Sequence, residues 1–371
     1  FNDGGTQISK LVASIKNAAG LKVEGDIQYK GQYIEELARD LKPQLDRPEQ
    51  EIGEQATQLI FERFIKPAIA KMGVHFDVWF NEKDLMSSGQ QAKAFDRLRR
   101  ENLLYEQDGA LWLRSSSYGD DKDRVLVKSN GDPTYLGNDI AYHLNIFEQR
   151  NFDIAFKIWG ADHMANVASL GLTVKKLLPD KQLVFVINQF VRLVRDGQEY
   201  RISKRAGTYV TVEELIDEIS SDVARFFFLM RSADSHMDFD LDLAKQQSQK
   251  NPYWYVMYAY VRANSILSQA EKQGLKAAAE TRRLNDLERQ LVKQMARFPG
   301  LLREIAGDYG VHRLTFYGLE LSRTFHDYYE SERIIDLKAN EASQKLYLIQ
   351  QYLQFMRIFF DLLGITPIKK M

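Results

Sequence analysis

The chain has 371 residues, with 50 Lys and Arg against 51 Asp and Glu, so its formal net charge is −1. This length predicts two or three domains with cores of ordinary size. Because the chain contains no cysteine, disulfides, cysteine-ligated zinc sites and thiol nucleophiles are excluded. Its six histidines form no metal-binding pair, and no apolar run approaches the roughly 20 residues that cross a bilayer. We therefore expect a cytoplasmic protein with no membrane segment and no metal site of its own.

The first third of the chain shows mostly helical periodicity. In chain order the pattern predicts helices at residues 7–19, 51–72 and 90–102, a strand at 76–80 and a hairpin at 103–113. Pro67 is expected to kink or split the long helix, since proline lacks the N–H that an interior position donates. The Asp108-Gly109 pair is typical of the tight turn of a hairpin.

From residue 124 strands alternate with helices. The pattern predicts strands at residues 125–127, 156–159 and 183–187, and helices at 136–148 and 164–178. This alternation predicts a parallel, doubly wound sheet of the α/β class. Ligands of such sheets lie beyond the carboxyl ends of the strands, so residues 132–139, residues 160–163 and the loop around Ser203 are expected along one edge.

After residue 222 helical periods dominate. Residues 238–242 are expected to form a short acidic connector, and residues 251–363 a helical bundle broken at Gly274, at Pro299-Gly300 and at Gly310. We therefore divide the chain into residues 1–245 and 246–371. The second part carries 18 Lys and Arg against 13 Asp and Glu, which suggests a polyanionic partner, although chance unevenness would look the same.

The loop at residues 200–208 concentrates cationic and hydroxyl groups. Ser203, Lys204 and Arg205 can surround a polyanion, and Gly207 lets the backbone turn where a Cβ would clash. A solvated surface turn is the alternative, because charge clusters are usually exposed. Neither of the two common glycine-rich phosphate loops is present, so a nucleotide would have to be held in another way.

A strand end and a helix start supply further candidates. Gly160 lets a flat ring or a sugar approach the backbone, while Asp162 can accept from ribose hydroxyls and His163 can donate to a phosphate or ribose. The alternative for Asp162 is a helix N-cap. Tyr135 and Asp139 lie four residues apart and share a helix face, where a carboxylate can grip a planar guanidinium through two oxygens. The alternative for Asp139 is a surface position in the first helical turn.

Residues 253–260 hold five aromatic side chains, which cannot all face one core from a single helix. We expect some of them to be exposed and to stack on unpaired bases, with Arg262 nearby. Packing of this helix against the first domain is the alternative.

Together these stretches resemble the arginyl-tRNA synthetases, a family of class I aminoacyl-tRNA synthetases. Arg201-Ile202-Ser203-Lys204-Arg205 is similar to the Lys-Met-Ser-Lys-Ser/Arg loop of the class, and further similarity lies in residues 2–8, 131–143, 159–163, 222–229, 312–314 and 325–329. The resemblance implies that residues 1–245 form a Rossmann-type catalytic domain, incomplete at its N-terminus and with an insertion around residues 21–124. Residues 246–371 would form an all-α helical-bundle anticodon-binding domain.

The resemblance also implies a reaction, in which ATP activates L-arginine to arginyl-adenylate and the arginyl group passes to tRNA(Arg). Mg²⁺ would arrive with ATP, and the protein would be a monomer. The roles implied for individual residues are stabilisation of pyrophosphate by Lys204, Ser203 and Arg205; ATP binding by Gly160, Asp162, His163 and Gly207; arginine binding by Tyr135 and Asp139; and tRNA binding by Tyr253, Trp254, Tyr258, Arg262 and Met371.

The chain departs from the family in two places. The His-x-Gly-His motif of the class is absent, and Arg201 stands where the first Lys of the loop is usual. We therefore expect a fragment of an active ligase that lacks the N-terminal part and is itself poorly active. A non-catalytic tRNA-binding protein derived from a synthetase is the alternative. A cysteinyl-type synthetase is disfavoured, because that enzyme needs zinc ligands and the chain has no cysteine.

Overall fold

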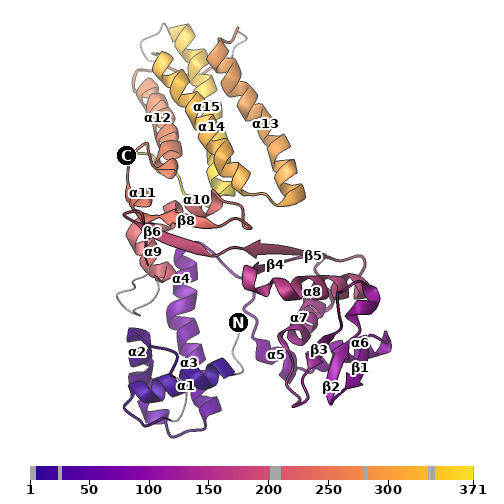
Figure 1. Ribbon diagram of the computed structural model, residues 1–371. Helices are drawn as coiled ribbons and strands as arrows, with labels where there is room; N and C mark the ends of the chain where they lie inside the picture. Colours follow the sequence, from indigo (N-terminus) through magenta and orange to yellow (C-terminus); the bar gives the residue numbers. More distant parts are fainter. Residues whose placement is uncertain are drawn as a thin grey trace.

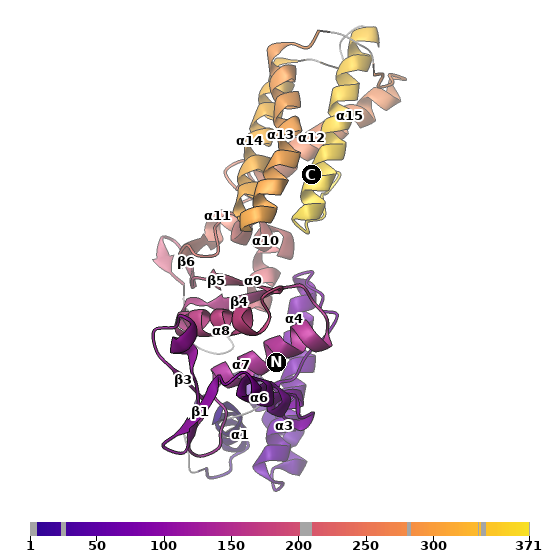
Figure 2. The ribbon, with the colours of Figure 1, turned by 90° about the vertical axis from the view of Figure 1, so that its right-hand side faces the viewer.

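The computed structural model describes residues 6–23, 27–200, 210–279, 283–332, 334 and 339–370. Two views at right angles show an elongated molecule with a bundle of long helices at one end and the strands and shorter helices at the other (Figures 1 and 2). Within the described residues, no helix is both long and apolar enough to cross a membrane. The expected helical bundle at the C-terminal end is confirmed.

The N-terminal helices form a small unit with its own core. They are α1 (Thr6–Ala18), α2 (Gln32–Leu41), α3 (Glu49–Ile60) and α4 (Lys66–Lys71). Val12, Ile15 and Ile52 are almost fully buried between them. A π-helical turn, Phe61–Ile65, joins α3 to α4, and Pro67 occupies the first turn of α4. The backbone stays helical on both sides of this turn, so the helix does not end at Pro67, and the expected kink or split takes the form of a π-helical turn just before the proline.

The strand predicted at residues 76–80 is wrong. This segment is irregular, with a bend at Asp77, and pairs with no strand of the described chain. Its apolar side chains contact one another and α3's continuation: the ring of Trp79 lies 4.6 Å from Phe76 and 4.8 Å from Phe61, measured between centroids. The alternation of apolar residues alone gave a wrong strand prediction, because a strand also needs a partner for its backbone hydrogen bonds.

The predicted hairpin is confirmed. Strands β1 (Leu104–Gln107) and β2 (Ala110–Leu113) are antiparallel, and the turn residues Asp108 and Gly109 have φ of 52° and 74°. Strand β3 (Arg124–Val127) also exists, but it pairs antiparallel with β2 instead of joining the parallel strands as expected. The helices α5 (Glu82–Ser87) and α6 (Gln90–Arg100) complete this layer.

A β–α–β unit follows. Strands β4 (Ile154–Gly160) and β5 (Gln182–Asn188) are parallel and paired along their whole length, with α8 (Met164–Leu177) as the crossover. The preceding helix α7 (Tyr135–Leu144) continues into a π-helical turn, Asn145–Gln149. Side chains from α6, α7, α8 and β3 share one core with the inner face of β4, including Leu98, Leu126, Ile140 and Leu170.

A third sheet corrects another prediction. It orders β7 (Gln198–Glu199), β6 (Val191–Arg195) and β8 (Met237–Asp240), with β8 parallel to β6. Residues 238–240 are therefore part of a strand, followed by α11 (Leu241–Lys245), and not a simple acidic connector. The reason is a period of two, since Met237 and Phe239 are buried while Asp238 and Asp240 are exposed.

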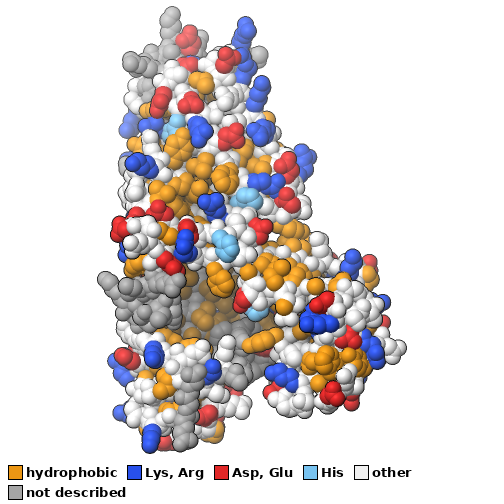
Figure 3. All heavy atoms as spheres, in the orientation of Figure 1, with side chains coloured by type: hydrophobic (Ala, Val, Ile, Leu, Met, Phe, Trp, Pro, Cys, Tyr) orange, Lys and Arg blue, Asp and Glu red, His pale blue; other side chains and the backbone are white. Residues whose placement is uncertain are grey.

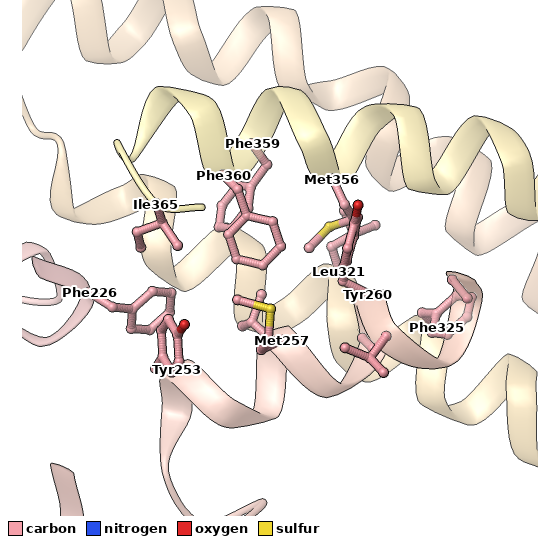
Figure 4. Packing of buried hydrophobic residues seen from close by; sticks show 14 of the residues in the cluster. Phe226, Tyr253, Met257, Tyr260, Leu321, Phe325, Met356, Phe359, Phe360 and Ile365 are labelled. Carbon is pink, nitrogen blue, oxygen red and sulfur yellow. The ribbon is translucent and has the colours of Figure 1, made fainter. Parts of the chain in front are cut away.

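The C-terminal bundle follows α9 (Val212–Ile219) and α10 (Ser221–Leu229) and consists of α12 (Pro252–Lys272), α13 (Asp286–Asp308), α14 (His312–Ser331) and α15 (Ala339–Leu362). Its core is rich in aromatic and sulfur-containing side chains (Figure 4). Gly274 and Gly310 lie at helix ends as predicted. The predicted break at Pro299 is wrong, because Pro299 lies inside α13 on its exposed side, where water can replace the lost hydrogen bond.

Candidate functional site

A cavity of about 320 Å³ opens between the start of α7 and the carboxyl end of β4. It is lined by Phe80, Glu82, Leu85, Tyr135, Asn138, Asp139, Tyr142, Lys157, Trp159 and His163. Three residues predicted from the sequence, Tyr135, Asp139 and His163, thus meet at one site. The expected edge is confirmed for these residues, whereas the Ser203 loop lies outside the described residues.

The start of α7 orients Tyr135 and Asp139. The hydroxyl of Thr134 caps the helix by accepting from the Gly137 N–H at 3.2 Å, and it donates to the Val125 carbonyl at 2.8 Å. The helix is thereby fixed to β3 at its first turn, and four residues on, Asp139 faces the same cavity as Tyr135. Tyr135 lies at the mouth, where 64% of its surface is exposed.

The carboxylate of Asp139 already has a cationic partner. Nζ of Lys157, on β4, lies 2.6 Å from Oδ1 of Asp139, and only 19% of each side chain is exposed. The same ammonium lies 4.8 Å from the ring centroid of Trp159 and 5.7 Å from that of Tyr142. Asp139 is therefore part of a half-buried charged pocket, which rules out the interpretation of Asp139 as an ordinary surface residue.

A second carboxylate, Glu82, approaches from α5. Its Oε1 accepts from Nδ2 of Asn138 at 2.6 Å, and the amide of Gln91 donates to Oδ1 of Asn138 at 2.5 Å. Asn138 thus holds Glu82 at the cavity wall beside Asp139. The sequence analysis missed both Glu82 and Lys157. A lysine within the otherwise apolar run Phe156-Lys157-Ile158-Trp159 was the available signal, since a charge inside a strand needs a partner.

His143, one helical turn after Asp139, is buried behind the site. Its Nδ1 lies 2.7 Å from the Asp139 carbonyl oxygen, to which the ring donates. Burial, aided by the positive charge of Lys157, lowers the pKa of His143 to about 4. At neutral pH the ring is uncharged, so it braces the backbone of Asp139 without adding a charge to the pocket.

The end of β4 presents polar groups to solvent. The rings of Trp159 and His163 stack at 5.4 Å, and Oδ2 of Asp162 lies 3.7 Å from Nε2 of His163. A Cβ at position 160 would lie 2.5 Å from Oδ1 of Asp162, so a larger residue there would require this exposed carboxylate to rotate away. The N-cap position of α8 is His163 and not Asp162, and the Asp162 side chain beside it is 62% exposed to solvent.

The loop that carries Ser203, Lys204, Arg205 and Gly207 lies outside the described residues, and so does Met371. The flanks of the loop are defined. Tyr200 donates its N–H to the Leu193 carbonyl at 2.8 Å, and Thr211 begins α9 with a capping box that involves Glu214. Helix α9 therefore begins a few residues after the loop.

The aromatic residues of α12 divide into two groups. Tyr253 is only 4% exposed and packs against Phe226 at the base of the bundle, so it is a core residue and its ring cannot stack on a base here (Figure 4). Trp254 is half-buried against the same core. Tyr258 is 36% exposed. The guanidinium carbon of Arg262 lies 4.7 Å from the Tyr258 ring centroid and 4.8 Å from that of Tyr329.

No cluster of three or more potential metal ligands exists among the residues that the structure describes. The cavity itself is lined by two carboxylates, one ammonium, the imidazole of His163 and the four aromatic rings of Phe80, Tyr135, Tyr142 and Trp159. Such a lining suits a cationic ligand with a flat or elongated apolar stem.

Two protein-family models match this chain. Residues 3–233 match the family model of the class I (R) tRNA synthetase catalytic domain, and residues 256–371 match the DALR anticodon binding domain. The arginine–tRNA ligase of Carboxydothermus hydrogenoformans is 38% identical over 390 residues, which cover 100% of this chain and 70% of that protein. That of Moorella thermoacetica is 43% identical, over 83% of this chain and 56% of its own length.

Solved structures of arginyl-tRNA synthetases have a fold similar to that of this chain. One assigned as an arginyl-tRNA synthetase from Campylobacter jejuni is 27% identical and superimposes with a TM-score of 0.88, covering 100% of this chain and 84% of that one. The Thermus thermophilus arginyl-tRNA synthetase, at 18% identity and a TM-score of 0.75, shares the fold. The chain therefore belongs to the arginine–tRNA ligase family of class I aminoacyl-tRNA synthetases, as its motifs suggested.

Proposed function

We propose that the protein joins L-arginine to tRNA(Arg) at the expense of ATP, and that the cavity between α7 and β4 binds the arginine side chain. The observation that carries this proposal is the half-buried carboxylate of Asp139 beside Tyr135 and Glu82. A guanidinium is the natural ligand of such a pocket, because its planar fork matches a carboxylate and its faces stack on aromatic rings.

The adenylate would form at the adjoining end of β4. A carboxylate oxygen of arginine bonds to the α-phosphorus of ATP while the bond to pyrophosphate breaks. Gly160, Asp162 and His163 line the nucleotide in this proposal, and the exposed Asp162 carboxylate suits ribose hydroxyls. Lys204, with Ser203, Arg205 and Gly207, would stabilise the pyrophosphate charge. Mg²⁺ would be held mainly by phosphates and water, as is usual for this ion.

The bundle would bind the tRNA. The stack of Tyr258, Arg262 and Tyr329 offers an exposed ring and a cation together, which suits an unpaired base and its phosphate. Trp254 and Met371 remain in this proposal, whereas the buried Tyr253 is removed from it. In the second step a ribose hydroxyl of the tRNA terminus attacks the arginyl carbonyl, and AMP leaves.

Pyrophosphate exchange tests the proposal. On the complete gene product, with tRNA present, we expect ATP–pyrophosphate exchange that depends on arginine. Asp139→Asn should lower it by about 100-fold or more, since a half-buried charge partner is lost. The matched control Asp153→Asn, which changes a carboxylate that is 88% exposed at the start of β4, should leave the rate unchanged. Absence of exchange with every amino acid, together with intact tRNA binding, would leave a non-catalytic tRNA-binding protein instead.

A further inference from the structure

Lys157 stands in an unusual place for a lysine. Along β4 the residues Ala155, Lys157 and Trp159 face the helices α7 and α8, whereas Phe156 and Ile158 face outward and are exposed. The lysine therefore projects from the covered face of a parallel strand. Only 19% of its side chain is exposed, so the ammonium exchanges most of its water for Asp139 and two aromatic rings.

The charges of the described cavity residues do not balance without a ligand. Among the lining residues that the structure describes, Asp139 and Glu82 are acidic and Lys157 is the one lysine or arginine. One cationic side chain added to the cavity would therefore bring these groups to neutrality. Asn138 is neutral and already engaged with Glu82 and Gln91, so it cannot supply that charge.

Lys157 uses one oxygen of Asp139, Oδ1. Within the described residues Oδ2 makes no hydrogen bond, and Asp139 lines the cavity. A guanidinium can take Oδ2 with one N–H and direct others toward Glu82 and Tyr135, because its five donors are fixed in a plane. A ligand ammonium is a point charge without this planar set of donors. It must therefore approach Asp139 more closely to reach the interaction energy that a guanidinium has. That approach brings it next to the ammonium of Lys157, which repels it.

We propose that Lys157 is a specificity-determining residue, which occupies Asp139 so that the pocket accepts the guanidinium of arginine and rejects the ammonium of lysine. This inference rests on the proposed function, because it concerns the same arginine pocket. Lys157 acts through Asp139 and through its own charge, and it takes no part in the transfer of any group.

The two substitutions Lys157→Met and Lys157→Arg should act in opposite directions. Methionine keeps the stem and removes the charge, so the pocket gains net negative charge and binds every cation more tightly. Arginine at this position places a guanidinium within reach of Asp139, so it competes with the ligand. Lys175→Met changes an exposed lysine of the neighbouring helix α8 and is the matched control.

Calorimetric titration of the full chain with L-arginine, L-lysine and L-citrulline measures the effect. Wild type and Lys175→Met should bind arginine well, lysine weakly and the uncharged citrulline weakly. Lys157→Met should bind lysine at least about tenfold more tightly, and the ratio of arginine to lysine affinity should fall; tenfold is one decade in Kd. Lys157→Arg should weaken arginine binding by about tenfold or more. A general structural role would lower all affinities together and would not move this ratio.

Asp139→Asn separates this inference from the proposed function. If arginine binding is lost in Asp139→Asn while both Lys157 variants keep the wild-type affinity ratio, Lys157 does not set specificity and only this inference is overturned. If Asp139→Asn binds arginine as tightly as wild type, or if wild type binds no arginine, the pocket is not the arginine site and both are overturned. Thermal denaturation of each variant, with and without arginine, verifies that the titrated protein is folded.

Discussion

The helical bundle buries its large apolar side chains, whereas β4 in the β4–β5 sheet leaves several of its own exposed. In the bundle, Tyr328, Tyr352, Phe359 and Phe360 are fully buried. On the sheet, the outward residues of β4 are exposed, and Ile158 keeps 67% of its surface in contact with solvent. Hydrophobic side chains accordingly gather on the molecular surface over β4 and β5 (Figure 3). The bundle encloses its own core, whereas the outer face of β4 is covered only in part, where the ring of Phe156 lies 4.8 Å from that of Tyr309 at the end of α13.

The two faces of β4 therefore differ in what they contribute to stability and to the proposed function. Parallel strands are normally covered on both faces, so the largely exposed outer face of β4 is unusual for this fold class. The chain spans 70% of the length of the Carboxydothermus relative, and the proposed arginine pocket lies on the covered face, where Lys157 and Trp159 point. Substitutions on the two faces of one strand, and in the two regions, should therefore have very different effects.

The largest effect is expected in the bundle. Phe360→Ala should lower the free energy of unfolding by about 3–5 kcal/mol, because it leaves a cavity beside Tyr260, whose ring lies 5.7 Å away. Ile358→Ala, on the exposed side of the same helix α15, should change it by no more than about 0.5 kcal/mol. Chemical denaturation followed by circular dichroism measures both. Equal effects of the two substitutions would show that the bundle does not have the described core.

The buried His143 should make the α7 region sensitive to acid. Its folded pKa of about 4 lies below the ordinary value of about 6.5, so the unfolded chain binds the proton more readily. Its contribution to stability is complete above pH 6.5 and is lost as the pH falls to 4, by about 3 kcal/mol in total.

Denaturation curves between pH 7 and pH 4 test this sign. His143→Gln should flatten the decline, leaving a residual slope of the same sign from His326, whose pKa burial also lowers. His163→Gln, which changes a half-exposed imidazole in the same cavity, should keep the wild-type slope. A decline that survives unchanged in His143→Gln would refute the assignment to His143.

A smaller effect is expected at the proposed tRNA-binding surface around Tyr258. Tyr258→Ala should weaken tRNA binding by about 1–3 kcal/mol, the usual contribution of one stacked base, and should leave stability nearly unchanged. Tyr347→Ala, which removes a comparably exposed ring on α15, is the control. Fluorescence anisotropy with labelled tRNA gives the affinities. Unchanged binding by Tyr258→Ala would exclude this ring from the contact.

The smallest effect is expected at Ile158, on the largely exposed outer face of β4. Ile158→Thr should change stability by no more than about 0.5 kcal/mol, because the side chain is exposed and threonine keeps the β-branched shape. Binding of a hydrophobic dye should decrease. A loss of about 2 kcal/mol or more would mean that this face is covered in the folded protein and that the comparison with the bundle fails.

Much of the fold could be predicted because its signals are local. The hairpin turn at Asp108-Gly109, the helix around Tyr135 and the helix irregularity before Pro67 each depend on a few neighbouring residues. The failures concern partners that are distant in sequence. Residues 76–80 alternate like a strand but have no partner, and the acidic stretch at 238–240 is a strand because β6 supplies one.

The sequence by itself determined the family and the order of the two domains, and it placed Tyr135, Asp139 and His163 at one edge, because motifs and periodicity are written along the chain. Only the tertiary structure decided that Tyr253 is a core residue and that Lys157 meets Asp139 at 2.6 Å. The physical reason is the same in both cases. Burial and ion pairing depend on which elements pack against each other, and neither β4 against α7 nor α12 against α10 can be read from a period within one segment.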